Sequence, residues 1–83
     1  MTTLEIEVDD LRATSVAFTA NDLVVTLADG RKIVTPLEWY PRLLHASAQD
    51  RGDYEILPMG IHWPRLDEDL SIAGMLKGRP KPV

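Results

Sequence analysis

The segment LVVTLADGRKIVT, residues 23–35, restricts the fold of this chain more than any other stretch. Two runs rich in β-branched residues flank an Asp-Gly pair at 29–30, and such a pair readily adopts the positive φ of a hairpin turn. A two-residue loop would place Val25 opposite Val34, whereas a three-residue loop would place Val25 opposite Ile33. Because the two registers send different side chains inward, the pattern predicts a β-hairpin and leaves its register open.

Strand patterns also occur on both sides of this hairpin. LEIEV (4–8) alternates apolar and acidic residues, and SVAFT (15–19) is rich in residues that favour strands. YEILPMGIHW (54–63) has strand character but contains Pro58 and Gly60. A proline inside a strand indicates an edge position or a bulge, so we expect one interrupted strand here.

The segment TPLEWYPRLLHASAQDRG, residues 35–52, carries the signals of a helix. The T-x-x-E pattern that begins at Thr35 predicts a capping box, and Gly52 suits a left-handed C-terminus. The proline after Tyr40 lacks an N–H group and crowds the preceding turn. We therefore expect one bent helix that turns at Tyr40–Pro41 and continues to about Arg51.

SIAGMLKG, residues 71–78, predicts a short helix with Ser71 as its N-cap and Gly78 as its stop. Its expected buried face consists of Ile72, Met75 and Leu76.

This order of elements, without strict alternation of strands and helices, predicts an α+β fold. We expect a small antiparallel sheet with a central hairpin, and one bent helix and a short C-terminal helix packed on one face. The chain of 83 residues is short enough for a single domain. We assign that domain to residues 1–78 and a flexible tail to residues 79–83.

Composition restricts the functional classes. Thirteen acids against nine bases give a formal charge of −4, which supplies no cationic face for nucleic acid. There is no cysteine for a disulfide or a thiolate site. No apolar run reaches the roughly 20 residues that span a bilayer, and the N-terminus has acids where a signal peptide would have Lys or Arg. We expect a cytoplasmic protein without membrane contact.

The segment HWPRLDEDL, residues 62–70, concentrates the residues that can carry chemistry. His62 and the acidic run Asp67–Asp69 could bind a divalent cation and activate water in a metal-dependent hydrolase. Consecutive side chains point in different directions, however, so these carboxylates converge only in an irregular loop. An alternative is purely structural, with the acids stabilised by the partial positive charge of the helix that follows near Ser71.

A third interpretation of this segment is an exposed acidic turn that docks a basic partner protein. Charge complementarity at such a surface sets specificity and association rate more than affinity. The expected partner-binding residues are Trp63, Arg65, Asp67, Glu68 and Asp69. We assign no catalytic residue, no cofactor and no metal ligand.

Two longer segments, DGRKIVTPLEWYPRL and GIHWPRLDEDLSIAGMLKG, resemble the small bacterial family called domain of unknown function 2442. The resemblance covers roughly residues 14–78, and its H-W-P-x-L-D-E-D part is the most specific. It implies an α+β fold and no established activity. Some relatives are fused to a helix-turn-helix domain, which we do not expect in this chain, so we carry over no DNA-binding role. Others are predicted to be encoded beside a second small protein, in arrangements that look like toxin–antitoxin pairs.

Together these observations favour a non-enzymatic protein-interaction or regulatory module, an antitoxin-like partner of a small protein encoded nearby. The alternatives are the metal-dependent hydrolase that uses His62 with Asp67–Asp69, and a structural homodimer. A homodimer could form by pairing of an exposed sheet edge with a second copy.

Overall fold

The computed structural model describes residues 12–78. Its first sheet has the strand order β1-β2-β3 and is antiparallel throughout, with strands β1 (Ala13–Phe18), β2 (Asp22–Leu27) and β3 (Lys32–Pro36). Val25 lies opposite Ile33, so the β2–β3 hairpin uses the three-residue loop. Gly30 closes that loop with a φ of +95°, a backbone conformation that glycine adopts without steric cost.

The hairpin loop also lowers the pKa of the Asp29 carboxyl below its ordinary value of 3.8. The main cause is the hydrogen bond that Arg31 Nε donates to Asp29 Oδ2 at 2.6 Å, and the Arg31 backbone N–H adds a second at 3.0 Å. A lowered folded-state pKa gives stability that is present above the unfolded value and is lost as the pH falls through the folded value.

We therefore expect Asp29 to titrate below 3.8 in the folded protein, and Arg31→Ala to move its pKa upward. A carbon-13 titration of the side-chain carboxyl measures both. Since the backbone hydrogen bond survives in Arg31→Ala, the pKa of Asp29 should rise only part of the way to its ordinary value. An Asp29 pKa that is the same with and without the guanidinium would contradict this account.

The predicted single sheet is wrong, because a second antiparallel sheet follows with the order β4-β5-β6. Its strands are β4 (Glu55–Leu57), β5 (Gly60–Trp63) and β6 (Glu68–Ser71). The segment 54–63 is not one interrupted strand, since Leu57 pairs with Gly60 across a two-residue turn that contains Pro58. The proline needs no hydrogen-bond donor in a turn, so it separates two strands and does not form a bulge.

The predicted bent helix is also wrong, because three short pieces take its place: η2 (Leu37–Trp39), α1 (Pro41–Leu44) and α2 (Ala48–Gly52). Thr35 is a buried residue of β3 and no cap. The chain does turn at Tyr40, where Pro41 begins α1 at the helical position that suits proline best. A second interruption arises because Ser47 caps a new helix, accepting a hydrogen bond from Asp50 N at 3.0 Å.

The last helix, α3 (Ile72–Lys77), begins and ends as the sequence predicts. Ser71 Oγ accepts from Gly74 N at 2.9 Å, and Gly78 follows with a φ of +87°. Ile72 and Met75 are buried, whereas Leu76 is exposed, contrary to prediction. Gly52, by contrast, is the last residue of α2 and does not have the positive φ that its position suggested.

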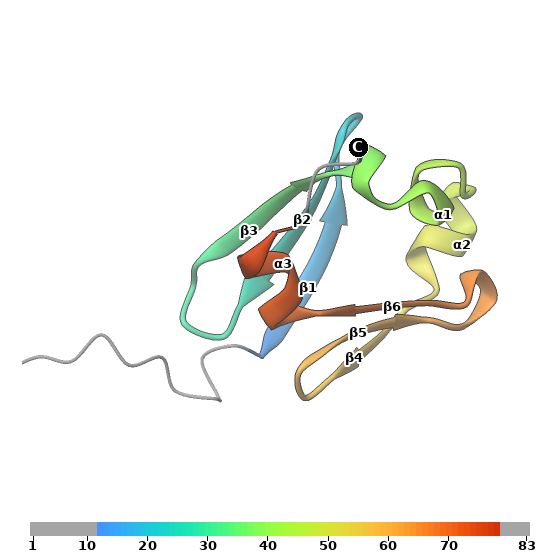
Figure 1. Ribbon diagram of the computed structural model, residues 1–83. Coiled ribbons are helices and arrows are strands. Elements are labelled where there is room, and N and C mark those ends of the chain that lie inside the picture. Colours follow the sequence, from blue (N-terminus) through green and yellow to red (C-terminus); the bar gives the residue numbers. More distant parts are fainter. Residues whose placement is uncertain (1–11, 79–83) are drawn as a thin grey trace, which may run out of the picture.

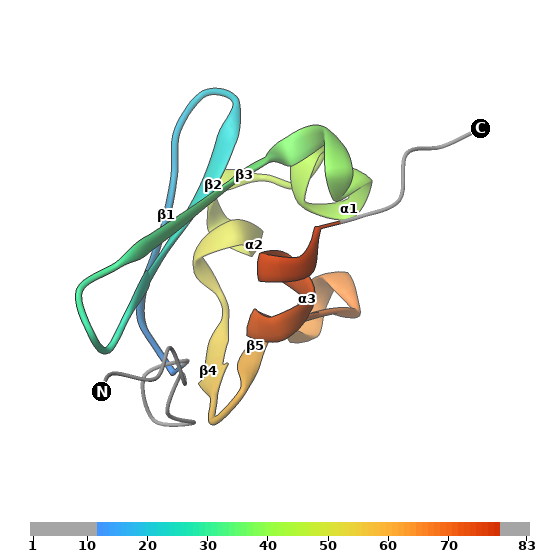
Figure 2. The same cartoon turned by 60° about the vertical axis from the view of Figure 1, so that its left-hand side comes forward.

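Both sheets contribute to one cluster of buried side chains. Figure 1 shows the second sheet running below the first, with α1 and α2 to one side, and in Figure 2 α3 lies in front of β5. Strand β1 contacts β4, and α3 contacts both β3 and β6. The buried apolar residues are Ala13, Leu23, Val25, Leu27, Leu37, Tyr40, Leu43, Ile61, Trp63, Ile72 and Met75.

The predicted strand at 4–8 and the predicted tail at 79–83 lie outside the described residues. Within residues 12–78, every helix is too short to cross a bilayer.

Candidate functional site

The strand β5 leads directly into the residues that the sequence singles out. Trp63, its last residue, is fully buried, and its indole Nε1–H donates to the Arg51 carbonyl at 2.9 Å. The rings of Phe18 and Tyr54 pack against it, with centroids 6.4 and 6.2 Å away. The prediction that Trp63 contacts a partner is therefore wrong. Its ring anchors the following turn to the core.

Asp67 is the apex of that turn. The short helix η3 (Pro64–Leu66) ends at this residue, which has left-handed backbone angles of φ 51° and ψ 45°. Its side chain is 95% exposed. Arg42 Nη1 donates to the Asp67 carbonyl oxygen, so α1 fixes the backbone of the turn while the carboxylate extends into solvent.

The same guanidinium also attracts the neighbouring carboxylates. Arg42 Nη1 lies 3.9 Å from Asp67 Oδ2 and 3.8 Å from Glu68 Oε1. The Glu68 side chain is only 18% exposed, because it lies opposite Trp63 in the β5–β6 pairing. Glu68 therefore supports the turn from within and offers little surface to a partner.

Asp69 faces the other side of the second sheet, because successive residues of a strand alternate between faces. Its carboxylate is 72% exposed and lies 2.6 Å from His62 Nδ1. A carboxylate only accepts, so the imidazole donates this hydrogen bond. Glu55 pairs with His62 from the opposite strand, which places an imidazole between two acids on this outer face.

This arrangement does not favour a metal centre. Asp67 and Glu68 are directed toward a guanidinium and Asp69 toward an imidazole, and residues 12–78 contain no group of three acids or histidines that could hold a metal ion. The carboxylates do not cap the last helix either, because they precede β6 or lie in it and Ser71 performs that role. The expectation that these acids stabilise the start of the last helix is therefore corrected, because Glu68 and Asp69 belong to β6.

Arg65, the remaining predicted contact residue, lies on η3, and its side chain is 64% exposed. Its Nε is 3.2 Å from Asp53 Oδ2, just after α2. An ion pair this exposed adds little stability, so Arg65 can exchange Asp53 for another acid.

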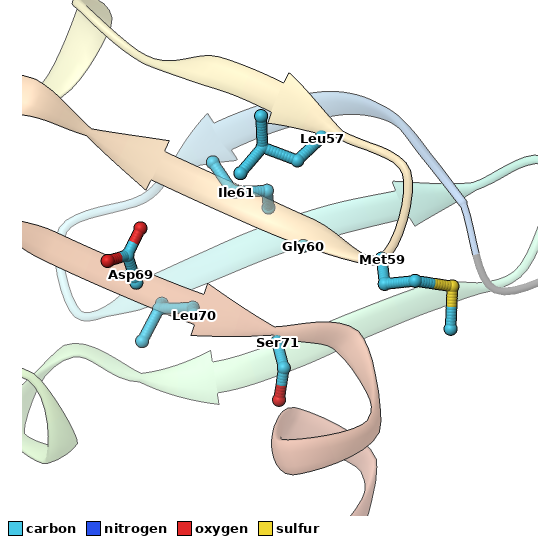
Figure 3. A pocket seen from close by; sticks show the side chains of 7 residues that line it. All are labelled: Leu57, Met59, Gly60, Ile61, Asp69, Leu70 and Ser71. Atoms are coloured by element: carbon cyan, nitrogen blue, oxygen red, sulfur yellow. The ribbon is translucent and has the colours of Figure 1, made fainter.

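An apolar depression of about 300 Å³ lies beside Asp69 on the second sheet. Figure 3 shows its lining, in which Leu57 and Met59 come from the β4–β5 turn region and Ser71 from the end of β6. Gly60 contributes no side chain there. A Cβ at this position would overlap the Leu70 carbonyl oxygen and lie 3.2 Å from Ser71 Cα, so the close approach of β5 to β6 requires glycine here.

Sequence reasoning missed two parts of this surface. Arg42 is 25 residues away from Asp67, and no local pattern connects them. The depression and the His62–Asp69 contact both require the β5–β6 register. In the structure the residues from Glu68 to Ser71 alternate between half-buried and exposed, but the two consecutive acids in their sequence disfavour a strand assignment.

Comparisons with known proteins give a fold without an activity. A crystal structure of a protein of unknown function from Rhodospirillum rubrum is 30% identical, with a TM-score of 0.66 over 80% of this chain and 84% of that one. The solution structure of an uncharacterized protein from Chromobacterium violaceum is 25% identical, with a TM-score of 0.70 over 86% of this chain and 69% of that one. The model of one family, described as protein of unknown function (DUF2442), matches residues 13–81. No curated protein matches the chain.

Proposed function

Because the chain belongs to the DUF2442 family of proteins of unknown function, whose description supplies no chemistry, we propose from its geometry that it is a non-enzymatic protein-interaction module. The contact surface consists of Arg65 and the exposed acids Asp67 and Asp69 of the acidic turn, defined here as residues 67–69. In the sharper form of this proposal the module acts in the cytoplasm as the antitoxin-like partner of a small basic protein encoded nearby.

The observation that carries this proposal is the conformation of Asp67. A left-handed backbone is uncommon for a residue other than glycine, although Asp tolerates it better than most. The fold nevertheless keeps a carboxylate at this apex, 95% exposed, and holds its backbone through Arg42. A rigid exposed charge loses little entropy on binding, which suits recognition of a cationic surface.

The revised contact set follows from exposure. Asp67, Asp69 and Arg65 are exposed, whereas Trp63 and Glu68 support them from below. The formal charge of −4 adds a long-range attraction for a basic partner. The hydrolase alternative has no such support, since the described acids diverge.

Co-purification with the product of the neighbouring reading frame tests this function. We expect a complex, and we expect Asp67→Lys combined with Asp69→Lys to weaken it at least tenfold. The control is Glu38→Lys, which reverses the charge of an exposed acid on η2 and should bind normally. Glu55 does not serve as a control position, because it lies opposite His62.

Absence of a complex, or equal losses in the turn variant and the Glu38 variant, would contradict the proposal. The alternative partner is a second copy of the chain. Sedimentation of the isolated protein at several concentrations distinguishes the two, because edge-to-edge pairing gives a dimer that needs no other protein.

A further inference from the structure

We propose that the depression over Gly60 is the anchor point of the interaction, and that it takes an apolar side chain from a partner segment that carries an arginine or lysine beside it. This inference rests on the proposed function and adds the chemistry of the partner. It concerns the outer face of the second sheet, next to the acidic turn.

The apolar half of the site comes from the β4–β5 turn. Leu57 and Met59 are 41% and 40% exposed, and both line the depression of about 300 Å³. Gly60, which has no side chain, lies between Leu57 and Ser71 on the neighbouring strands (Figure 3), so this part of the lining is backbone. Binding sites of this kind bury one apolar anchor in a preformed hollow, and a methionine in the wall adapts to its shape.

The charged half comes from Asp69, which lines the same depression with a carboxylate that is 72% exposed. His62 Nδ1 donates a single hydrogen bond to Asp69 Oδ1, so the rest of this exposed carboxylate can accept from another donor. Glu55 lies beyond His62 on the same face. A cation next to the anchor would meet Asp69 at the rim while its aliphatic stem covers apolar surface. An acidic residue next to the anchor would be repelled by the Asp69 carboxylate.

Three blocked hexapeptides, titrated into the nitrogen-15-labelled protein, test this inference. One has leucine followed by arginine between glycine and serine residues, one replaces the arginine with glutamate, and one replaces the leucine with serine. We expect the leucine–arginine peptide to shift the amide signals of Gly60, Ile61 and Ser71. It should bind roughly threefold to tenfold more tightly than either of the other two.

Variants of the exposed lining separate the two halves. Leu57→Ser with Met59→Ser should abolish the shifts, whereas Val34→Ser, which changes a more exposed apolar residue of the first sheet, should leave them unchanged. Asp69→Asn should remove the preference for arginine over glutamate while the leucine still binds.

Equal affinity for all three peptides, or shifts that survive in Leu57→Ser with Met59→Ser, would overturn the inference. These outcomes are distinct from failure of the proposed function. If the peptides do not bind at the depression but reversal of Asp67 still dissociates the co-purified partner, only the anchor is wrong.

Discussion

Replacing Trp63 with alanine is expected to lower the free energy of unfolding by about 3–5 kcal/mol. The side chain is fully buried, packs against two aromatic rings and donates a hydrogen bond to the Arg51 carbonyl at 2.9 Å. Small domains are stable by only about 5–15 kcal/mol, so this variant should be close to unfolding. Urea denaturation monitored by circular dichroism measures the loss.

Trp63→Phe keeps one aromatic ring but removes the N–H donor and the volume of the second ring, so a loss of about 1–3 kcal/mol is expected from the unpaired Arg51 carbonyl and the small cavity. Val34→Ala changes a side chain that is 59% exposed and should alter stability by less than about 0.5 kcal/mol. A Trp63→Ala loss as small as that of Val34→Ala would show that the turn is not anchored by this residue.

Gly60→Ala is expected to cost about 1–3 kcal/mol, because the added methyl group would overlap backbone that cannot move without breaking the β5–β6 pairing. The obstacle is the Leu70 carbonyl oxygen and not the flexible end of a side chain. The midpoint of thermal unfolding reports the change.

Gly52→Ala is the matched control for this substitution. Gly52 ends α2 and has open space around the position of a Cβ, so alanine there should be neutral or stabilise by up to about 1 kcal/mol. We expect Gly60→Ala to lower the stability of the protein and Gly52→Ala to leave it unchanged or raise it. Equal effects would mean that the close approach at Gly60 has no energetic consequence.

Features encoded within a few residues could be predicted from the sequence. The Asp-Gly pair at 29–30 indicated the β2–β3 hairpin, although its register depended on a loop length that the pattern did not decide. Ser71 and Gly78 correctly marked the two ends of α3. Each of these signals depends on the backbone preference of one or two residues and needs no distant contact.

Features that depend on contacts between distant residues could not be predicted. The run Glu68–Ser71 forms a strand only because β5 pairs with it, and its composition pointed to a loop before a helix. Arg42 lies on α1, which ends at Leu44 and is not part of one long helix, and its guanidinium contacts the acidic turn. Ser47 marks the second interruption by capping α2, where the sequence predicted one helix that continues to about Arg51.

The association rate constant of the complex, measured at several salt concentrations, tests the central claim most directly. Asp67→Gly removes the charge of the acidic turn and keeps the left-handed backbone that glycine adopts freely. We expect this variant to associate several-fold more slowly at low salt, with a difference that shrinks as salt screens the charge. The same rate and the same salt dependence for both proteins would contradict recognition of a basic partner through this turn.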